Sequence, residues 1–219
     1  SILRVQFFAT DDVEVNHIYT ENSGSMILSD FIIDANYLNT TGPITAKHSC
    51  IKMKDCNNMF GEKCLITDNA ITSNPDAVSL KMHSIHIDNV FDLSLENFAI
   101  NGTFISGGEN SNIKELRGFY GELGGNWVIS DFLLNTQYFD KGTNGTCYGL
   151  EIKDVTLSIR IKHCVSNNNG FFTDKIYPDQ CGGFIAGGKE DSNITFIECC
   201  SNSNTGGTFT TSFTSDYNN

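Results

Sequence analysis

A four-residue element recurs eight times along this chain: an apolar residue, a variable residue, a polar residue that is usually Asp or Asn, and another apolar residue. In each copy the first apolar residue faces a core, the polar residue makes a corner, and the last apolar residue begins a strand facing the same core. Asp and Asn suit such corners because they tolerate left-handed backbone and hydrogen-bond their own main chain. The copies are Leu28–Phe31, Met53–Cys56, Ile87–Val90, Leu95–Phe98, Ile129–Phe132, Ile152–Val155, Ile161–Cys164 and Phe196–Cys199.

The stretch from Cys181 to Phe209 reads as one turn of a coil, with Gly-Gly steps at both ends and an Asn-rich corner between short apolar segments. Half of it has an earlier copy, because FISGGENSNI from Phe104 matches FIAGGKEDSNI from Phe184. Such a unit cannot bury its apolar face alone, so repeated units predict stacked rungs. We therefore predict an all-β fold, a right-handed parallel β-helix (a solenoid) with irregular loop insertions.

The copies of the corner element are unevenly spaced, so we expect rungs that differ in loop length. The region 44–77 is the least regular and holds three cysteines, which indicates a loop or cap insertion, or a small helix. No linker divides the chain, so we predict a single domain over residues 1–219. Both ends look cut, and we expect a fragment of a longer chain. The expected long loops are Thr40–Pro43, Asn57–Asp76, Tyr138–Cys147 and Asn167–Gln180.

Composition favours short strands with polar corners, since there are 20 Gly against 3 Pro and asparagine is very common. A net charge of −12 argues against a nucleic-acid partner or an anionic membrane surface. No run approaches the ~20 apolar residues of a transmembrane helix, so we expect no membrane span in this segment.

The eight cysteines are an even number, which would allow four disulfides in an oxidising compartment. Buried thiols stacked in the core are an equally good interpretation, and zinc is a weaker one because no CxxC pair is present. The disulfide candidates, with pairing unknown, are Cys50, Cys56, Cys64, Cys147, Cys164, Cys181, Cys199 and Cys200. Four sequons are also candidate glycosylation sites, about the number expected by chance: Asn39, Asn101, Asn144 and Asn193.

Two kinds of short motif resemble a known repeat family. GGFI at Gly182 and GGTF at Gly206, with FAIN at Phe98 and FLLN at Phe132, are similar to the repeats of chlamydial-type polymorphic outer-membrane proteins. Those repeats alternate GGA[ILV] with FxxN on a parallel β-helix. CCSN at Cys199 stands where an FxxN would fall.

The resemblance covers mainly Asn97 to Phe209 and departs at the third motif position, where Phe184 or Thr208 replaces Ala. The autotransporter barrel of the family is absent. Similar Asn-rich repeats occur in surface proteins of large DNA viruses and of protozoa. The resemblance implies adhesion, display or virion-surface roles and brings no catalytic residues with it.

Parallel β-helices also carry polysaccharide lyases and hydrolases. Arg160–Lys162 repeats the RIK of polygalacturonases, and Asp11 and Asp12 are paired carboxylates. Inverting hydrolysis needs two carboxyl groups ~6.5–9.5 Å apart. The NTD and GHG motifs that accompany RIK in that family are missing, so this signal is weak.

His83, His86 and Asp88 form the only compact histidine cluster in the sequence. Residues 86 and 88 share a face of a strand, where imidazole and carboxylate could bind zinc or act as a base with its orienting group. The plainer interpretation, which we prefer, is an outward polar ladder opposite inward Ile85 and Ile87. We therefore expect no catalytic residues, no metal and no cofactor.

Several aromatic residues flank expected loops rich in Asn, Gly and Asp, and such platforms suit sugar recognition. The candidate ligand-binding residues are Tyr138, Tyr148 and Tyr177. We expect a non-catalytic surface module, an adhesin passenger or a virion fibre or spike component, that recognises a host-surface glycan or protein. Neighbouring subunits or flanking domains would cap its end rungs, and its location would be extracellular, at a cell surface or on a virion. The alternatives are a pectin-lyase-like carbohydrate-active enzyme and a purely architectural capsid or wall component.

Overall fold

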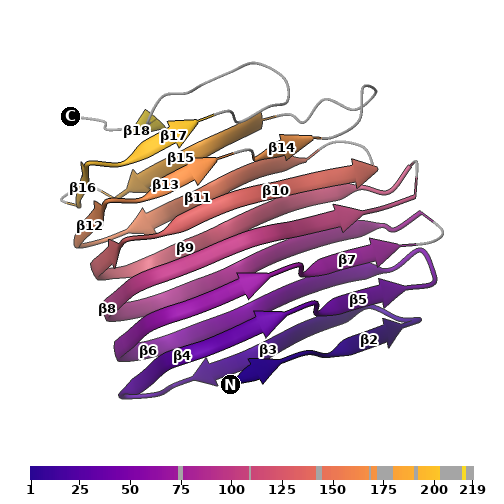
Figure 1. The fold of residues 1–219 in the computed structure, drawn as a ribbon, viewed down its shortest axis with the longest axis horizontal. Helices are drawn as coiled ribbons and strands as arrows, with labels where there is room; N and C mark the ends of the chain where they lie inside the picture. The colour runs from indigo at the N-terminus through magenta and orange to yellow at the C-terminus, as the bar shows by residue number, and fades with distance from the viewer. Residues whose placement is uncertain are drawn as a thin grey trace.

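The computed structural model describes residues 1–73, 76–108, 110–141, 145–167, 169–171, 180–189, 192–202 and 214–215, with the backbone alone for 136–141, 170–171, 180–181 and 214–215. These residues form no helix, and every strand pairing among them is parallel. Figure 1 shows the strands stacked from the N-terminal to the C-terminal end. They are β1 (Ile2–Leu3), β2 (Gln6–Ala9), β3 (Val13–Glu21), β4 (Met26–Asp34), β5 (Tyr37–Thr40), β6 (Thr45–Thr67), β7 (Ala70–Ser73), β8 (Ser79–Ser106), β9 (Ile113–Ser130), β10 (Leu133–Lys141), β11 (Thr146–Val155), β12 (Ser158–Lys162), β13 (Val165–Asn167), β14 (Gly170–Phe171), β15 (Gln180–Gly188), β16 (Asn193–Ile197), β17 (Cys200–Asn202) and β18 (Thr214–Ser215).

The fold is the predicted parallel β-solenoid, in which residues paired on neighbouring turns are 29 to 35 positions apart. Residues one turn apart lie side by side and form columns along the stack. One inward column is apolar at every rung, so each rung buries the apolar face of the next. It consists of Ile18, Ile51, Ile85, Phe119, Leu150 and Phe184.

The eight copies of the corner element stack at two corners, five at one and three at the other. Of the sixteen non-glycine residues with positive φ in the described part of the chain, eleven are Asn or Asp, which confirms the predicted role of these side chains. Asp55 and Asn89 are examples one rung apart, and the Asn89 amide donates to Asp55 at 2.6 Å.

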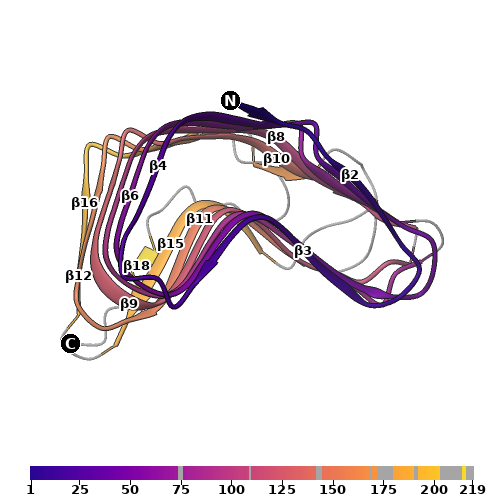
Figure 2. The same ribbon diagram turned by 90° about the horizontal axis from the view of Figure 1, so that it is seen from below.

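The cross-section is curved, with a concave side formed by β3, β11, β15 and the N-terminal parts of β6, β8 and β9 (Figure 2). The core is divided at this curve into a larger cluster that includes Phe98 and Trp127 and a smaller one around Met82. Between them a hydrogen bond from Ser84 to Thr103, 3.4 Å long and buried, joins the two opposite walls. The two apolar clusters therefore meet at a buried polar contact on the concave side.

Region 44–77 is not the expected loop or cap. It forms β6 and β7, which pair with β3, β4 and β5 on one side and β8 on the other. Its sequence looked irregular because β6 places polar side chains on the concave side and passes two corners without a break. The expected loop at Asn57–Asp76 is wrong for the same reason, and the rungs are more uniform than the uneven motif spacing predicted. That spacing arose because the element marks two different corners.

The two similar segments at Phe104 and Phe184 are not structurally equivalent. Phe104 pairs with Ala70, whereas Phe184 pairs with Leu150 in a different column. Their separation is not a whole number of turns. CCSN, FLLN and FAIN, in contrast, share one register: Asn202 lies beside Asn167, Asn167 beside Asn135, and Asn135 beside Asn101.

Candidate functional site: a polar groove on the concave side

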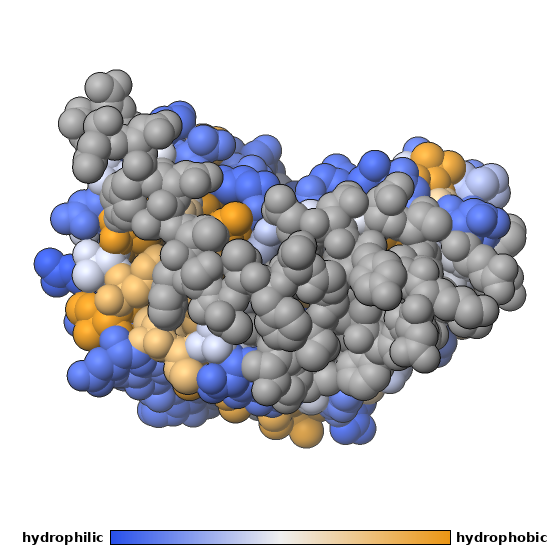
Figure 3. Space-filling view, turned by 90° about the horizontal axis from the view of Figure 1, so that it is seen from above, coloured by the Kyte–Doolittle hydropathy of each residue, from blue (hydrophilic) through white to orange (hydrophobic). Residues whose placement is uncertain are grey.

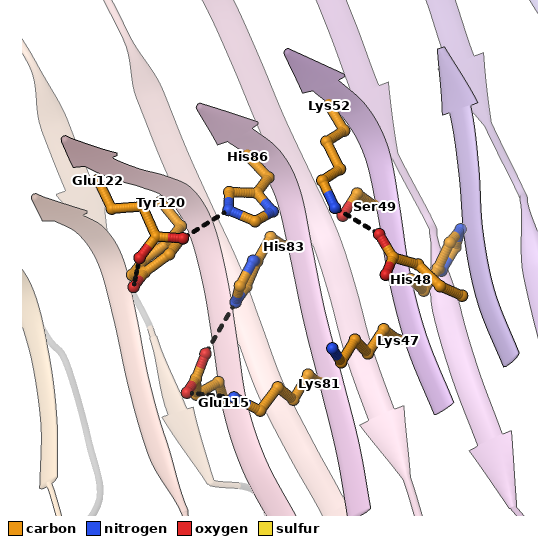
Figure 4. Close-up of a pocket in the computed structure, with 11 residues that line it drawn as sticks. Lys47, His48, Ser49, Lys52, Lys81, His83, His86, Glu115, Tyr120 and Glu122 are labelled. Carbon is orange, nitrogen blue, oxygen red and sulfur yellow. Dashed lines mark hydrogen bonds and ion pairs between the residues drawn. The ribbon is translucent and has the colours of Figure 1, made fainter. Parts of the chain in front are cut away.

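The concave side holds a pocket of about 200 Å³. Seen from above, the outline of the molecule is notched on this side, and hydrophilic side chains lie at the notch (Figure 3). Four neighbouring strands, β3, β6, β8 and β9, supply the lining, so the groove crosses the rungs along the stack (Figure 4). The lining residues are Glu14, Lys47, His48, Ser49, Lys52, Lys81, His83, His86, Glu115, Tyr120 and Glu122.

A break in strand alternation creates this groove. In β8 the consecutive residues Ser84 and Ile85 are both buried, so the strand bends where two neighbours point inward. The outward residues on either side, His83 and His86, then lean toward each other, and their rings make an edge-to-face contact with centroids 5.0 Å apart. The plain expectation of an outward histidine ladder opposite Ile85 and Ile87 is thus correct, and the bend turns that ladder into a pocket.

His83 is paired with a carboxylate from the next rung. Its Nε2 lies 3.1 Å from one oxygen of Glu115, and the ammonium of Lys81 lies 2.9 Å from the other. Burial raises the pKa of Glu115, but the hydrogen bonds from His83 and Lys81 outweigh it and hold that pKa well below its ordinary value. Burial lowers the pKa of His83 to about 4, against the opposing hydrogen bond to Glu115. At neutral pH a neutral imidazole therefore donates its Nε2 hydrogen to an ionised carboxylate, and Nδ1 keeps its lone pair.

His86 has a second carboxylate. Its Nε2 lies 3.2 Å from Glu122, whose other oxygen accepts a hydrogen bond from the Tyr120 hydroxyl at 2.9 Å. The hydrogen bond from His86 lowers the pKa of Glu122, while burial and the charge of Glu122 raise the pKa of Tyr120. The Tyr120 ring lies 4.6 Å from the His83 ring and 5.2 Å from the His86 ring, centroid to centroid. Three rings and two carboxylates thus form one connected wall (Figure 4).

A buried ion pair lies beside this wall. Arg117 and Glu151 are only 2% and 3% exposed and are hydrogen-bonded to each other. Arg117 also donates to the Thr146 carbonyl at 2.6 Å, and its guanidinium lies 4.8 Å from the centroid of the Tyr148 ring. With both charges compensated, the pair can hold the strands under the groove in one geometry.

The groove contains no metal centre of the usual kind. Among the described residues, no three His, Cys, Asp or Glu side chains come together where they could hold a metal ion. The imidazoles and carboxylates are instead bonded to one another. The groove can therefore offer hydrogen-bond donors, acceptors, ring faces and one neutral imidazole nitrogen.

Of the three tyrosines predicted to bind a ligand, only Tyr148 has a described side chain. It does not flank a loop: it lies in β11, is buried, and packs against Arg117, so its ring is not an open platform. The side chain of Tyr138 and the whole of Tyr177 lie outside the described residues. The aromatic residue of the groove is Tyr120, which the sequence analysis did not single out.

The sequence cluster identified His83 and His86 but gave them the wrong carboxylate. Their partners are Glu115 and Glu122, which lie 32 and 36 residues further along. Asp88 is one rung below Glu122 in the same column. The register pairs His83 with Arg117 and His86 with Tyr120, so each glutamate lies two positions from the residue directly opposite its histidine on β9. Asp12 instead accepts a hydrogen bond from the Thr45 main chain outside the pocket, at 2.7 Å.

The seven described cysteines, all except Cys181, carry free thiols. Cys199 is half-buried, Cys200 is exposed, and the buried ones are Cys50, Cys56, Cys64, Cys147 and Cys164. Among the sequons, Asn193 is exposed, Asn39 and Asn101 are half-buried, and Asn144 lies outside the described residues.

No protein-family model, curated protein or solved structure matches this chain. Within the described ranges, no helix is long and apolar enough to cross a membrane.

Proposed function

We propose that this chain is a surface binding module that recognises a carbohydrate in the concave groove. The observation that carries the proposal is the connected wall of Tyr120, His83 and His86 with Glu115 and Glu122 in a solvent-open pocket. Sugars present apolar ring faces and hydroxyls, and aromatic rings beside polar groups recognise both.

The charges of the groove support a hydroxyl-rich ligand. Each acidic side chain of the lining is already bonded to a cation or a hydrogen-bond donor, as in the contact between Lys52 and Glu14. A hydroxyl can donate to such a carboxylate and accept from an ammonium or an imidazole N–H, so both charge types are useful. The pocket is smaller than the ~300–1,000 Å³ that holds a drug-sized ligand, which suits one unit of a longer chain lying along the groove.

In this proposal the solenoid supplies rigidity and reach, as in an adhesin passenger or a virion fibre or spike, at a cell or virion surface. The N-terminal edge of the stack, from β1 to β4, exposes large apolar side chains: Ile2 is 62%, Phe8 74% and Ile27 72% exposed. Unpaired strand edges and exposed apolar groups favour a covering partner, here a neighbouring subunit or flanking domain. Light scattering should then show either self-association of the chain or its binding to a flanking domain. The double variant Phe8→Ser/Ile27→Ser should abolish this association. A monomer that binds no flanking segment would contradict this part.

The test of function is a glycan array read both for retention of the protein and for loss of each arrayed sugar. Retention without loss is expected, and His86→Ala and Tyr120→Phe should each weaken it about tenfold, since a hydrogen bond to a charged group contributes roughly 1.5–3 kcal/mol. Arg160→Ala is the matched control, because Arg160 is exposed in β12 and does not line the groove. Retention that survives both groove variants would refute the groove as the binding site.

An enzyme is the second candidate, and the pair of His83 and Glu115 is the observation that favours it. A neutral imidazole oriented by a carboxylate is the arrangement of a general base. Loss of an arrayed sugar would support this candidate, and His83→Ala should abolish the loss while leaving retention in place. Neither retention nor loss would favour an architectural component with protein partners alone.

A further inference from the structure

We propose that Cys164 and Cys199 form a reactive dithiol site that closes to an inter-rung disulfide by thiol–disulfide exchange. The site lies away from the groove, at the corner that precedes β13 and β17, and does not depend on the proposed function. It assigns one pair among the eight cysteines and names the class of co-reactant, a small-molecule disulfide.

The register places the two residues one above the other. Val165 and Cys200, the residues that follow them, are paired in parallel strands, and the Cys200 N–H donates to the Cys164 carbonyl at 2.9 Å. Neighbouring parallel strands lie about 4.8 Å apart. That spacing falls within the ~4.4–6.8 Å between α-carbons that a disulfide spans.

Both side chains point from this corner into the core, where Cys164 is buried and Cys199 packs against the same apolar cluster. Cys199 Sγ also lies 3.4 Å from the Ile161 and Ile197 carbonyls, while Cys164 Sγ lies 3.2 Å from the Lys162 carbonyl. The neighbouring Cys164 thiol lowers the pKa of the Cys199 thiol to about 6 against the effect of burial, and the Cys199 thiol raises the pKa of Cys164. Cys199, which is half-buried, is therefore the nucleophile, and the buried Cys164 is the resolving thiol.

The molecule contains its own control at Cys64, which occupies the same column of corners. Its Sγ lies 3.1 Å from the Glu62 carbonyl, much as in the other two, but its neighbours above and below are Phe31 and Phe98. Burial raises the pKa of Cys64 to about 11. Cys64 has the same backbone corner as Cys164 and Cys199. The difference in pKa between Cys64 and Cys199 therefore comes from the thiol beside Cys199.

The exchange balances with oxidised glutathione as co-reactant. The Cys199 thiolate attacks one sulfur of glutathione disulfide, forms a mixed disulfide and releases one glutathione thiolate. Cys164 loses its proton as it attacks the Cys199 sulfur and displaces the second glutathione thiolate. The two protein sulfurs are oxidised by two electrons in total, the small disulfide is reduced, and both thiol protons go to solvent or to the released thiolates.

The experiment incubates the full chain with oxidised glutathione, alkylates the remaining thiols, digests without reduction and identifies linked peptides by mass spectrometry. We expect a Cys164–Cys199 peptide in the wild type and in Cys64→Ser, and none in Cys199→Ser. Cys164→Ser should trap glutathione on Cys199. Because the bridge closes a long loop, oxidation should raise the melting temperature by roughly 5–10 °C in the wild type.

Two results would overturn the proposal: both thiols remaining alkylatable after oxidation, or Cys199 linked to Cys200 instead of Cys164. The wild-type peptide map gives the answer even where a serine variant folds poorly. Alkylation rates against pH give an independent reading, since Cys199 should react half-maximally near pH 6 and Cys64 only at much higher pH.

Discussion

Two pairs of histidines on the concave side differ in their hydrogen-bond partners, and of these four residues His48, His83 and His86 line the groove. His17 and His48 lie on adjacent rungs with their Nε2 atoms 2.7 Å apart and, among the described residues, bond no carboxylate. His83 and His86 lie on one strand, and each bonds its own glutamate. Burial lowers the pKa of His17 to about 4 and that of His48 to about 3.

The difference shows how the same side chain becomes structural or functional. In the first pair the only hydrogen bond joins the two rings, and the buried Nδ1 of His48 has no partner among the described residues, so this pair can only lose stability on protonation. In the second pair the carboxylates fix the direction of each ring, and the neutral imidazole of His83 keeps a lone pair on Nδ1. The first pair is thus a packing element with a cost in acid, and the second is the candidate site.

The largest effect is expected when the buried ion pair beside the second pair of histidines, Arg117 and Glu151, is disrupted. Glu151→Gln leaves the buried Arg117 without its counter-charge and should lower the free energy of unfolding by about 3–5 kcal/mol. Urea unfolding measures it. The double variant Arg117→Met/Glu151→Met removes both charges and should recover most of the loss. A single-variant loss below about 1 kcal/mol would contradict the ion pair as a support of the groove.

The next effect tests the first pair through pH. Between pH 6.5 and about 4 the unfolded chain protonates its histidines while His17, His48 and His83 stay neutral in the fold, so the unfolded state binds more protons and stability falls as pH falls. His17→Gln/His48→Met should reduce this pH-dependent loss by roughly 2–4 kcal/mol, because each unit of pKa difference corresponds to about 1.4 kcal/mol. Unfolding series at several pH values measure it. An unchanged slope would mean that the first pair is not the main acid-sensitive element.

A smaller effect isolates the second pair. Glu115→Gln removes the charge that Lys81 and His83 share and should destabilise the fold by about 1–2 kcal/mol. It should also lower the pKa of His83 further, since the carboxylate opposes the effect of burial. Proton NMR of the imidazole follows that pKa directly. Glu122→Gln is the matched control, which should affect His86 and leave His83 unchanged; equal shifts in both variants would contradict the separate pairing.

The comparison also shows what the sequence could reveal. The corners are local signals, because the side chain of a residue such as Asp55 or Asn89 itself indicates left-handed backbone. The recurrence of these corners was sufficient to predict the solenoid. The pairing of His83 with Glu115 is not local: it joins residues 32 positions apart through the register of neighbouring turns. An analysis limited to neighbouring residues therefore selected Asp88, the carboxylate nearest in sequence, as the partner of the histidines.

The prediction of a loop or cap at region 44–77 was wrong for a related physical reason. A strand is recognised by alternation, and at the bend of β6 Cys50 and Ile51 both face inward while polar residues fill the concave side. The feature that hid this strand is the one that forms the groove. Sequence rules thus fail at the candidate site itself, as expected where local regularity gives way to a binding surface.

The smallest effect concerns a corner on the rung next to the second pair, the rung that carries Glu115 and Glu122. There Leu123 has a φ of 59°, in the column where neighbouring rungs carry Asp55, Asn89 and Asp154. A branched side chain in this conformation costs roughly 1–2 kcal/mol, which Asn largely avoids. Leu123→Asn should therefore stabilise the fold by about 1 kcal/mol, measured by urea unfolding. Asn89→Leu is the reverse control and should destabilise by at least as much, since it also removes the bond to Asp55. If Leu123→Asn left stability unchanged or lowered, packing of the half-exposed Leu123 would outweigh its backbone, and the corners would not be the interchangeable units that the repeated element implies.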